Sequence, residues 1–342
     1  MKKVISLAAA LALTIGLLAG CGPKEPQQPQ GGNEGGDTLV VYTARSESLN
    51  NAVIENFEKD TGIKVEVVTG GTGEILKRVQ SEASNPQGDI CWAADGPQLR
   101  GYVDYFENYV SPSDAGMMEG YKNTSGYSAP AFCDPPVFIV NTDLAGDIEI
   151  NGFADLLNPA LKGKIAFCDP AASSSAFEHL VNMLYAMGGG DTEEGWDYVR
   201  KFCEQLDGKM LGGSSAVYKG VADGEYTVGL TFEQGSAQYV GAGAPVKTVY
   251  MEEGVIFRGD GVYIIKDCPN MKSAQIFLDW LTSKEVQEFM NNTQYRRTIR
   301  KDVESGDAMV PMEDINVIKD DETNTAEHKA EWLDKFKDIF TQ

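Results

Sequence analysis

The stretch from Lys164 to Leu184 has the pattern of a strand, a loop and a helix, and it constrains how the rest of the chain is interpreted. Ile165 to Cys168 form a short apolar run that suits a buried strand. Asp169-Pro170 ends this run, because proline lacks an N–H and disfavours helix in the residue before it. Ser173 to Ser175 then supply hydroxyls for a helix start. The N–H groups and dipole of such a helix start favour an anion, although for a single turn of this kind a capped turn without a ligand is the better interpretation.

The same design recurs along the chain. Loops with Ser, Thr or Gly at an expected helix start are Ala44–Ser46, Gly70–Gly73, Ala172–Ser175 and Gly212–Ser215. Strands that alternate with helices predict an α/β fold, in which ligands gather at the carboxyl edge of the strands. Two such lobes facing each other would bring these loops into one cleft, which suits a small anionic ligand. The candidate binding residues in these loops are Arg45, Ser46, Thr72, Gly73, Ser174, Ser175, Ser214 and Ser215. Arg45 can contact the anion or lie in solvent as an ordinary surface arginine.

The N-terminal part of the chain is expected to direct and anchor the protein. Two lysines and an apolar run predict a signal peptide over residues 1–20. The run ends in Leu18-Ala19-Gly20-Cys21, which looks like a bacterial lipobox and implies cleavage before Cys21 and lipidation of its thiol. Residues 21–37 are the lipidated cysteine and a flexible tether. A single-pass anchor helix is the alternative, but the run is short for a membrane span. We therefore expect a lipid anchor at the outer face of the bacterial cytoplasmic membrane, at the cell surface or in the periplasm.

Charge and motif content exclude several classes of function. A formal net charge of −22 argues against nucleic acid as a partner. The six cysteines show no metal-ligand spacing, and no cofactor motif or enzyme signature is present. We therefore predict no cofactor, no metal and no catalytic residues. A thiol nucleophile at Cys91 or Cys133 is the remaining enzyme hypothesis, although each is more often a packed cysteine.

The chain resembles the type 2 periplasmic binding proteins, the extracellular solute-binding components of bacterial ABC importers. The resemblance is to the branch that binds ferric ion, phosphonate, thiamine and hexose phosphate. The matching stretches are Val40–Glu47 (VVYTARSE), Phe57–Gly62 (FEKDTG), Phe153–Pro170 (FADLLNPALKGKIAFCDP), Val221–Gly235 (VADGEYTVGLTFEQG) and Ser273–Met290.

This resemblance implies two mixed-sheet α/β lobes joined by hinge strands around a central cleft, in a monomer that delivers its ligand to an ABC permease. The implied division is residues 38–135 plus 250–300 for the first lobe and 136–249 for the second. Residues 301–342 form a helical tail that packs on a lobe. The hinge strands are expected near Pro135 and Pro245, so that the lobes can close on the ligand.

The resemblance indicates the family more specifically than it indicates the ligand. Iron-binding members use a histidine, an acidic residue and adjacent tyrosines where this chain has Ser46, Ala94 beside Asp95, and Glu233-Gln234. Because phenolate oxygens make such a site suit Fe³⁺, simple ferric binding is disfavoured. Asp95 and Glu233 join the candidate residues, the latter to bind sugar hydroxyls or an amine. The expected order is a phosphorylated sugar or similar organophosphate first, a phosphonate second, and iron or thiamine third. A sensor or adhesion module that binds a protein is a further alternative.

Overall fold

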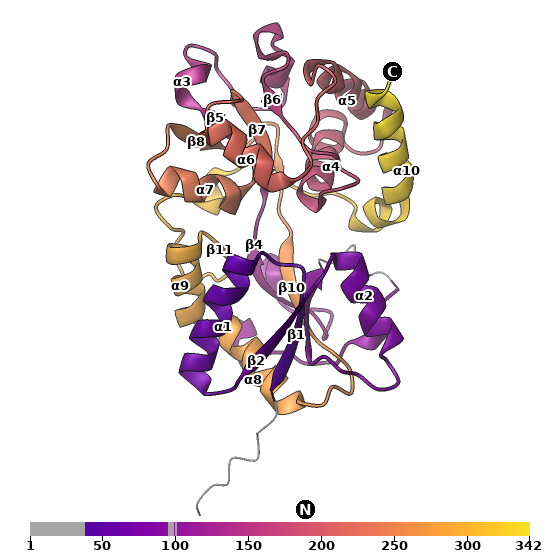
Figure 1. The fold of residues 1–342 in the computed structure, drawn as a ribbon, viewed down its shortest axis with the longest axis vertical. Coiled ribbons are helices and arrows are strands. Elements are labelled where there is room, and N and C mark those ends of the chain that lie inside the picture. Colours follow the sequence, from indigo (N-terminus) through magenta and orange to yellow (C-terminus); the bar gives the residue numbers. More distant parts are fainter. Residues whose placement is uncertain (1–37, 95–98, 100) are drawn as a thin grey trace, which may run out of the picture. The chain divides into compact units, whose positions relative to one another are not determined.

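A computed structural model of the chain describes residues 38–94, 99 and 101–342. The predicted signal peptide, Cys21, the tether and Asp95 lie outside these residues. The described part contains two main sheets, and we name each sheet with its helices as the first and the second lobe (Figure 1).

The first lobe contains a six-stranded sheet with the order β11-β4-β10-β3-β1-β2. Strand β1 pairs in parallel with β2 and β3, whereas β10 is antiparallel to β3 and β4, and β11 is antiparallel to β4. The strands are β1 (Leu39–Thr43), β2 (Val65–Thr69), β3 (Ile90–Ala94), β4 (Ala129–Cys133), β10 (Gly259–Ile264) and β11 (Arg297–Thr298). The helices α1 (Glu47–Thr61), α2 (Thr72–Ser81), α8 (Met271–Leu281) and α9 (Lys284–Gln294) contribute to the same hydrophobic core.

The second lobe contains a four-stranded sheet with the order β6-β7-β5-β8. Its strands are β5 (Pro136–Asn141), β6 (Ile165–Ala166), β7 (Val228–Phe232) and β8 (Val246–Val249). The short strands β9 (Val255–Ile256) and β12 (Val317–Ile318) pair in parallel beside it. The helices are α3 (Thr142–Ala145), α4 (Ser174–Gly188), α5 (Glu193–Gln205), α6 (Ser214–Ala222), α7 (Glu233–Gly241) and α10 (Glu322–Phe340).

Short 3₁₀ segments connect these elements in both lobes. They are η2 (Val103–Tyr105), η3 (Pro112–Gly116), η4 (Glu119–Tyr121), η5 (Ala154–Leu157), η6 (Pro159–Leu161) and η7 (Met312–Asp314). Two of the longer helices end at a glycine: Gly62 after α1 and Gly189 after α4 have φ of 75° and 71°. Glycine suits these left-handed positions because it has no Cβ to clash with the backbone.

The chain crosses between the lobes next to the central cleft. Asp134-Pro135 joins β4 of the first lobe to β5 of the second, and Phe257-Arg258 joins β9 to β10 on the way back. A third crossing, over residues 299–316, leads from β11 of the first lobe to β12 of the second. The second crossing differs from the expected position near Pro245. Pro245 precedes β8, an edge strand of the second sheet, and its carbonyl accepts a hydrogen bond from the N–H of Thr142 (2.9 Å).

The return to the first lobe also comes later than residue 250. Met251, Val255 and Ile256 are buried in the hydrophobic core of the second lobe, because β9 pairs with β12 there. The C-terminal helix α10 belongs to this core as well. Trp332 and Phe336 are fully buried in it, and α10 lies beside α5 (Figure 1).

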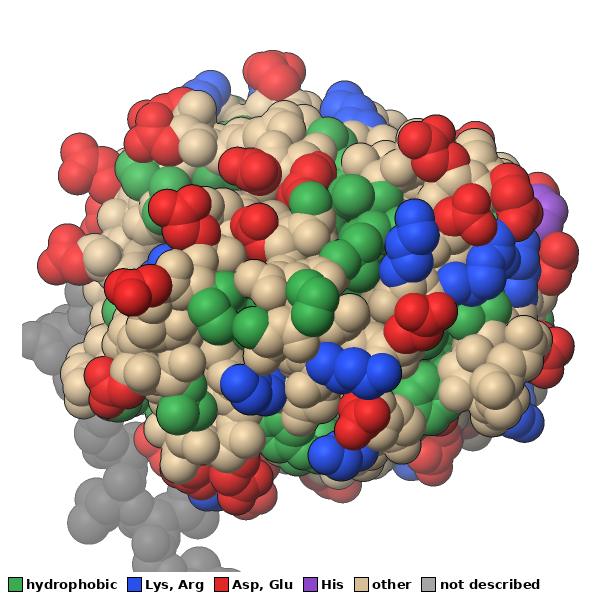
Figure 2. All heavy atoms as spheres, turned by 90° about the horizontal axis from the view of Figure 1, so that it is seen from above, with side chains coloured by type: hydrophobic (Ala, Val, Ile, Leu, Met, Phe, Trp, Pro, Cys, Tyr) green, Lys and Arg blue, Asp and Glu red, His purple; other side chains and the backbone are tan. Residues whose placement is uncertain are grey.

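The surface is acidic without a single acidic patch on the face that Figure 2 shows. Asp and Glu side chains are spread over this face, with Lys and Arg side chains between them (Figure 2). Charges of both signs that alternate in this way favour solubility. Among the described residues, no helix is both long enough and apolar enough to cross a membrane.

Candidate binding site

A cavity of about 580 Å³ collects loops from both lobes. We call it the central cavity. Its first-lobe lining includes the starts of α1 and α2, and its second-lobe lining includes the starts of α4 and α6. The lining residues are Ala44, Arg45, Ser46, Leu49, Thr72, Ala93, Asp134, Pro135, Pro136, Ala172, Ser173, Ser174, Ser175, Glu178, Gly213, Ser214, Ser215, Tyr218, Phe232, Gln234, Ile256, Arg258, Gly259, Asp260 and Arg296.

The helix starts at the cavity are of two kinds. At α1 and α4 a serine cap is in place, since Ser46 Oγ accepts from the N–H of Leu49 and Ser173 Oγ accepts from the N–H of Ala176 (both 3.4 Å). At α2 and α6 the cap residues are Gly71 and Gly213, which have no side chain to accept a bond. First-turn N–H groups of an uncapped helix need another partner, so an anion in the cavity can accept hydrogen bonds from both helices.

Charged side chains of alternating sign form a row along the cavity wall. Arg45, in the loop after β1, contacts Asp260 on β10, and Asp260 also accepts from Nη2 of Arg296 (2.8 Å). Arg296 Nη1 reaches Asp134 Oδ2 at the first crossing (2.5 Å). Asp134 Oδ1 accepts from the backbone N–H of Gln234 at the start of α7 (3.0 Å). This row of charges therefore connects the first lobe to the second at the first crossing.

Burial affects the ionisation of Asp134 and Arg296 in this row of charges. Asp134 lies in a low-dielectric environment that raises the pKa of its carboxyl, and the neighbouring Arg296 opposes this effect. Arg296 is 4% exposed, and its pKa stays above the ordinary value because Asp134 and Asp260 outweigh its own burial. The arginines of the wall contact carboxylates and still leave part of their donor capacity unused: Nε of Arg45, Arg258 and Arg296 is buried without a hydrogen-bond partner.

A separate ion-pair cluster lies at the second crossing. Arg258 contacts Glu178 of α4 through Nη1 and Asp320 of the C-terminal segment through Nη2. Glu178 lines the cavity, whereas Asp320 is 3% exposed at its side chain and lies behind the arginine. Asp320 also accepts from Thr325 Oγ1 (2.8 Å), which fixes it further.

Most of the predicted site residues line the central cavity. These are Arg45, Ser46, Thr72, Ser174, Ser175, Ser214 and Ser215. Gly73 lies in the first turn of α2 next to Thr72 but is not part of the lining, and Asp95 lies outside the described residues.

Glu233 occupies a different place from the one expected. It is fully buried at the start of α7 and does not line the cavity. Both of its oxygens accept from Arg297, with distances of 2.6 to 3.0 Å, and Tyr250 donates to it as well. Because Glu233 is fully buried away from the cavity and paired with Arg297, we remove it from the candidate site.

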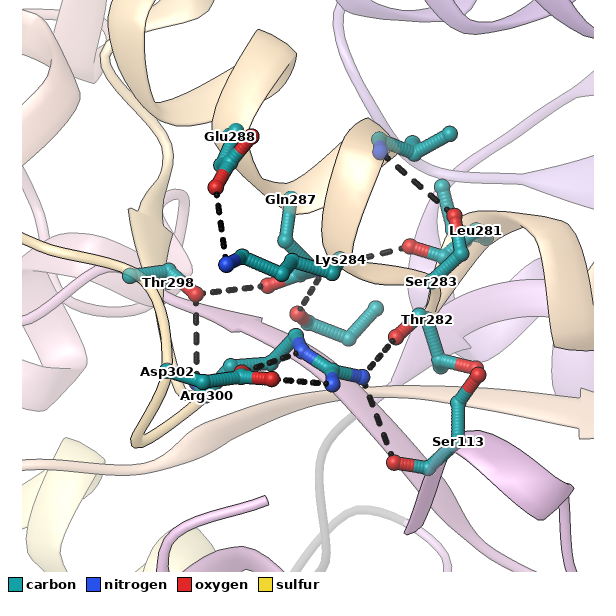
Figure 3. Close-up of polar contacts among 12 residues, drawn as sticks. Ser113, Leu281, Thr282, Ser283, Lys284, Gln287, Glu288, Thr298, Arg300 and Asp302 are labelled. Atoms are coloured by element: carbon teal, nitrogen blue, oxygen red, sulfur yellow. Dashed lines mark hydrogen bonds and ion pairs between the residues drawn. The ribbon is translucent and has the colours of Figure 1, made fainter. Parts of the chain in front are cut away.

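Arg300, the neighbouring basic residue on the chain, is also engaged in structure. Its Nε and Nη2 donate to the two carboxylate oxygens of Asp302 (2.8 and 2.9 Å), as Figure 3 shows. Its Nη1 donates to the carbonyl of Thr282 (2.9 Å). Arg300 therefore fixes the segment after β11 against the end of α8 and against η3, and it does not line the central cavity.

The thiols of Cys91 and Cys133, which were the candidate nucleophiles of an enzyme, are not activated. Cys91 and Cys133 are fully buried, and neither lines the central cavity. Burial raises the pKa of each thiol to about 12. A thiol with such a pKa carries almost no thiolate at neutral pH, and the thiolate is the nucleophile.

Sequence reasoning missed the charged wall of the cavity. Asp134, Glu178, Arg258, Asp260 and Arg296 were not among the candidates, although each lines it. The available signal was a set of charges within otherwise apolar segments, such as Arg258-Gly259-Asp260 in the strand region from Val255 to Ile265. Charged residues are rarely fully buried without a partner, so such positions point to pairing inside the fold.

Comparison with known proteins identifies the fold and the family. A family model for bacterial extracellular solute-binding proteins matches residues 52–323. The periplasmic binding protein AfuA from Actinobacillus pleuropneumoniae, solved with exogenous fructose-6-phosphate, has a TM-score of 0.77 at 22% identity, covering 89% of this chain and 98% of that one.

Two further relatives cover most of the chain. Iron uptake protein A1 from Synechocystis sp. is 25% identical over 315 residues, 86% of each chain. A structure described as a two-component system protein that mediates signal transduction is 28% identical with a TM-score of 0.74, covering 87% of this chain and 100% of that one. The predicted type 2 periplasmic-binding-protein fold and the resemblance are thereby confirmed, and this chain belongs to the bacterial extracellular solute-binding protein family.

Proposed function

We propose that this protein captures a small anionic solute in the central cavity for an ABC importer, and that the solute is an organophosphate such as a phosphorylated sugar. The observation that carries this proposal is the meeting of the starts of α1, α2, α4 and α6 at one cavity. Two of these helices have no side-chain cap, so their N–H groups are available to a phosphoryl group.

The rest of the cavity suits the polar body of such a ligand. Its volume of about 580 Å³ is in the range of small-molecule sites. Gln234 and the serine hydroxyls of α4 and α6 can exchange hydrogen bonds with sugar hydroxyls. AfuA, which has the same fold, was solved with fructose-6-phosphate, a ligand of this chemical class.

Phosphonate is the second choice, because it presents the same oxygens to the helix starts. Ferric ion comes third with thiamine, despite the iron-related names of several relatives and solved structures. Among the described residues, no group of three or more His, Cys, Asp and Glu side chains could hold a metal ion. The carboxylates of Asp134, Asp260 and Glu178 each contact an arginine, which would compete with a cation.

The transport step in this proposal is closure of the two lobes about the crossings at Asp134-Pro135 and Phe257-Arg258. Lipidation at Cys21 and the tether over residues 21–37 would hold the monomer at the outer face of the membrane, where the permease is encountered at high effective concentration. A receptor that passes the bound state to a signalling protein is the second candidate, favoured by the signal-transduction relative at 28% identity.

A thermal-shift panel on protein that has been unfolded, stripped of ligand and refolded tests the proposal. The panel contains glucose 6-phosphate, fructose 6-phosphate, 2-aminoethylphosphonate, inorganic phosphate, thiamine and ferric citrate. A ligand that binds only the folded state raises the unfolding midpoint in proportion to the logarithm of its concentration over Kd. We expect the largest shift with an organophosphate. A shift with ferric citrate alone would contradict the proposal, and no shift at all would favour a protein-binding role.

A further inference from the structure

The Arg258 cluster places a carboxylate of the protein where a ligand anion would bind. Arg258 lines the central cavity at the second crossing, and its side chain is only 8% exposed. Glu178 contacts it from the cavity side and Asp320 from the protein side. Glu178 accepts a hydrogen bond from Arg258, whereas Asp320 accepts from Thr325 as well as from Arg258.

The position of Glu178 on its helix explains why it faces the ligand space. It lies one turn after Ser174 and Ser175 at the start of α4, and residues at this spacing share one helix face. All of these residues line the cavity. An anion at the start of α4 would therefore lie beside the Glu178 carboxylate and compete with it for Arg258.

We propose that Glu178 is a specificity-determining residue that acts as a built-in competitor, and that only an anion able to displace it from Arg258 binds tightly. The inference rests on the proposed binding function. Asp320 stays on the arginine during the exchange, because it is buried and fixed by Thr325. Glu178, whose side chain is 22% exposed, is the partner that can turn away.

The competitor discriminates between classes of anion. A ligand carboxylate that replaces Glu178 exchanges one carboxylate for another on Arg258, so the exchange adds little to the free energy of binding. A phosphoryl group carries more negative charge and has three strong acceptor oxygens. It can therefore bind Arg258 and accept from the uncapped helix starts of α2 or α6 at the same time. Glu178 thus favours phosphoryl ligands over carboxylates of similar size.

Calorimetric titration of the wild type and Glu178→Gln with glucose 6-phosphate, fructose 6-phosphate and glucuronate tests this. Glutamine keeps the size of the side chain but removes its charge, so Arg258 is released to the ligand. We expect the variant to bind the phosphosugar about tenfold more tightly, which is the scale of one charge-assisted hydrogen bond. We expect the gain for glucuronate to be larger, so that the phosphate-over-carboxylate preference decreases.

Glu149→Gln is the matched control, because it removes one negative charge from an exposed position of the same lobe and should leave both affinities unchanged. If Glu178→Gln does not fold, Glu178→Ala is a second variant that lacks the carboxylate. A folded Glu178 variant with equal or weaker phosphosugar affinity than the wild type would overturn the inference while leaving the proposed function in place. Absence of anion binding in the wild type and in both Glu178 variants would overturn the proposed function itself.

Discussion

At the residue scale, the pair of Glu233 and Arg297 is the clearest case of charge buried for structure. Glu233 is fully buried, Arg297 is 1% exposed, and the pair joins α7 of the second lobe to β11 of the first. Arg297 also donates to the carbonyl of Val310 (2.7 Å) and so holds the segment that leads to the C-terminal tail. Burial alone would favour the neutral acid and raises the pKa of Glu233, while Arg297 favours the carboxylate.

Removal of one partner should therefore be costly. We predict that Arg297→Met lowers the free energy of unfolding by about 3–5 kcal/mol, because Glu233 is left as a buried charge without a partner. Equilibrium urea denaturation measures the change. Arg200→Met is the control, since Arg200 pairs with Glu193 and Asp197 on the surface and should change stability far less. Equal effects of the two substitutions would contradict this account of the buried pair.

Because His179 is buried, we predict that the free energy of unfolding depends on pH. It is fully buried on α4, its Nε2 lies 2.7 Å from the carbonyl of Thr231, and burial lowers its pKa from 6.5 to about 4. The unfolded chain therefore binds a proton at a higher pH than the folded protein does. The stabilising contribution of neutral His179 is complete above pH 6.5 and decreases as the pH falls toward 4.

The lowered pKa corresponds to a loss of about 3 kcal/mol over this pH range. His179→Gln keeps a donor for Thr231 but does not titrate, so its stability should vary less between pH 7 and pH 4. Urea denaturation of both proteins at several pH values measures the difference. Parallel pH profiles for the variant and the wild type would contradict the assignment of this dependence to His179.

At the element scale, the uncapped start of α6 should distinguish helix stability from ligand binding. Gly213 has an extended backbone, with φ of −178°, and a Cβ built there meets nothing within 4 Å. We predict that Gly213→Asp caps α6, raises stability by a few tenths of a kcal/mol and weakens binding of a phosphosugar at least about tenfold, because its charge occupies the anion position.

Gly213→Asn is the control for this prediction. Asparagine caps a helix about as well as aspartate but carries no charge, so it should keep much more of the affinity. Calorimetry measures binding and thermal unfolding measures the effect on the helix. If the aspartate variant bound the phosphosugar as tightly as the wild type, the start of α6 could not be part of the anion site.

The helix starts could be predicted from the sequence because their signals are local. Ser46 and Ser173 lie within a few residues of the N–H groups that they accept from. The charged wall could not be predicted in the same way. Asp134, Asp260 and Arg296 are far apart in sequence and meet only because β10 and β11 both pair with β4. The prediction that Glu233 contacts the ligand failed for the same reason, since its partner Arg297 comes from a strand that is distant in sequence.

At the scale of the whole molecule, the crossings between the lobes determine how the two lobes can move when they close on a ligand. Asp134-Pro135 and Phe257-Arg258 both line the cavity with at least one residue, so the hinge and the ligand site are adjacent. We predict that a bound phosphosugar reduces the radius of gyration measured by small-angle X-ray scattering. An unliganded sample in the same buffer is the control, and an unchanged radius at saturating ligand would contradict closure about these crossings.

The measurement that tests the central claim most directly is a crystal structure of the protein with an organophosphate identified by the thermal-shift panel. The account predicts the phosphoryl group in the central cavity, with oxygens within hydrogen-bond distance of first-turn N–H groups of α2 or α6 and of an arginine of the wall. A phosphoryl group bound away from the helix starts would contradict the account, as would a metal ion held by Asp134, Glu178 or Asp260 in its place.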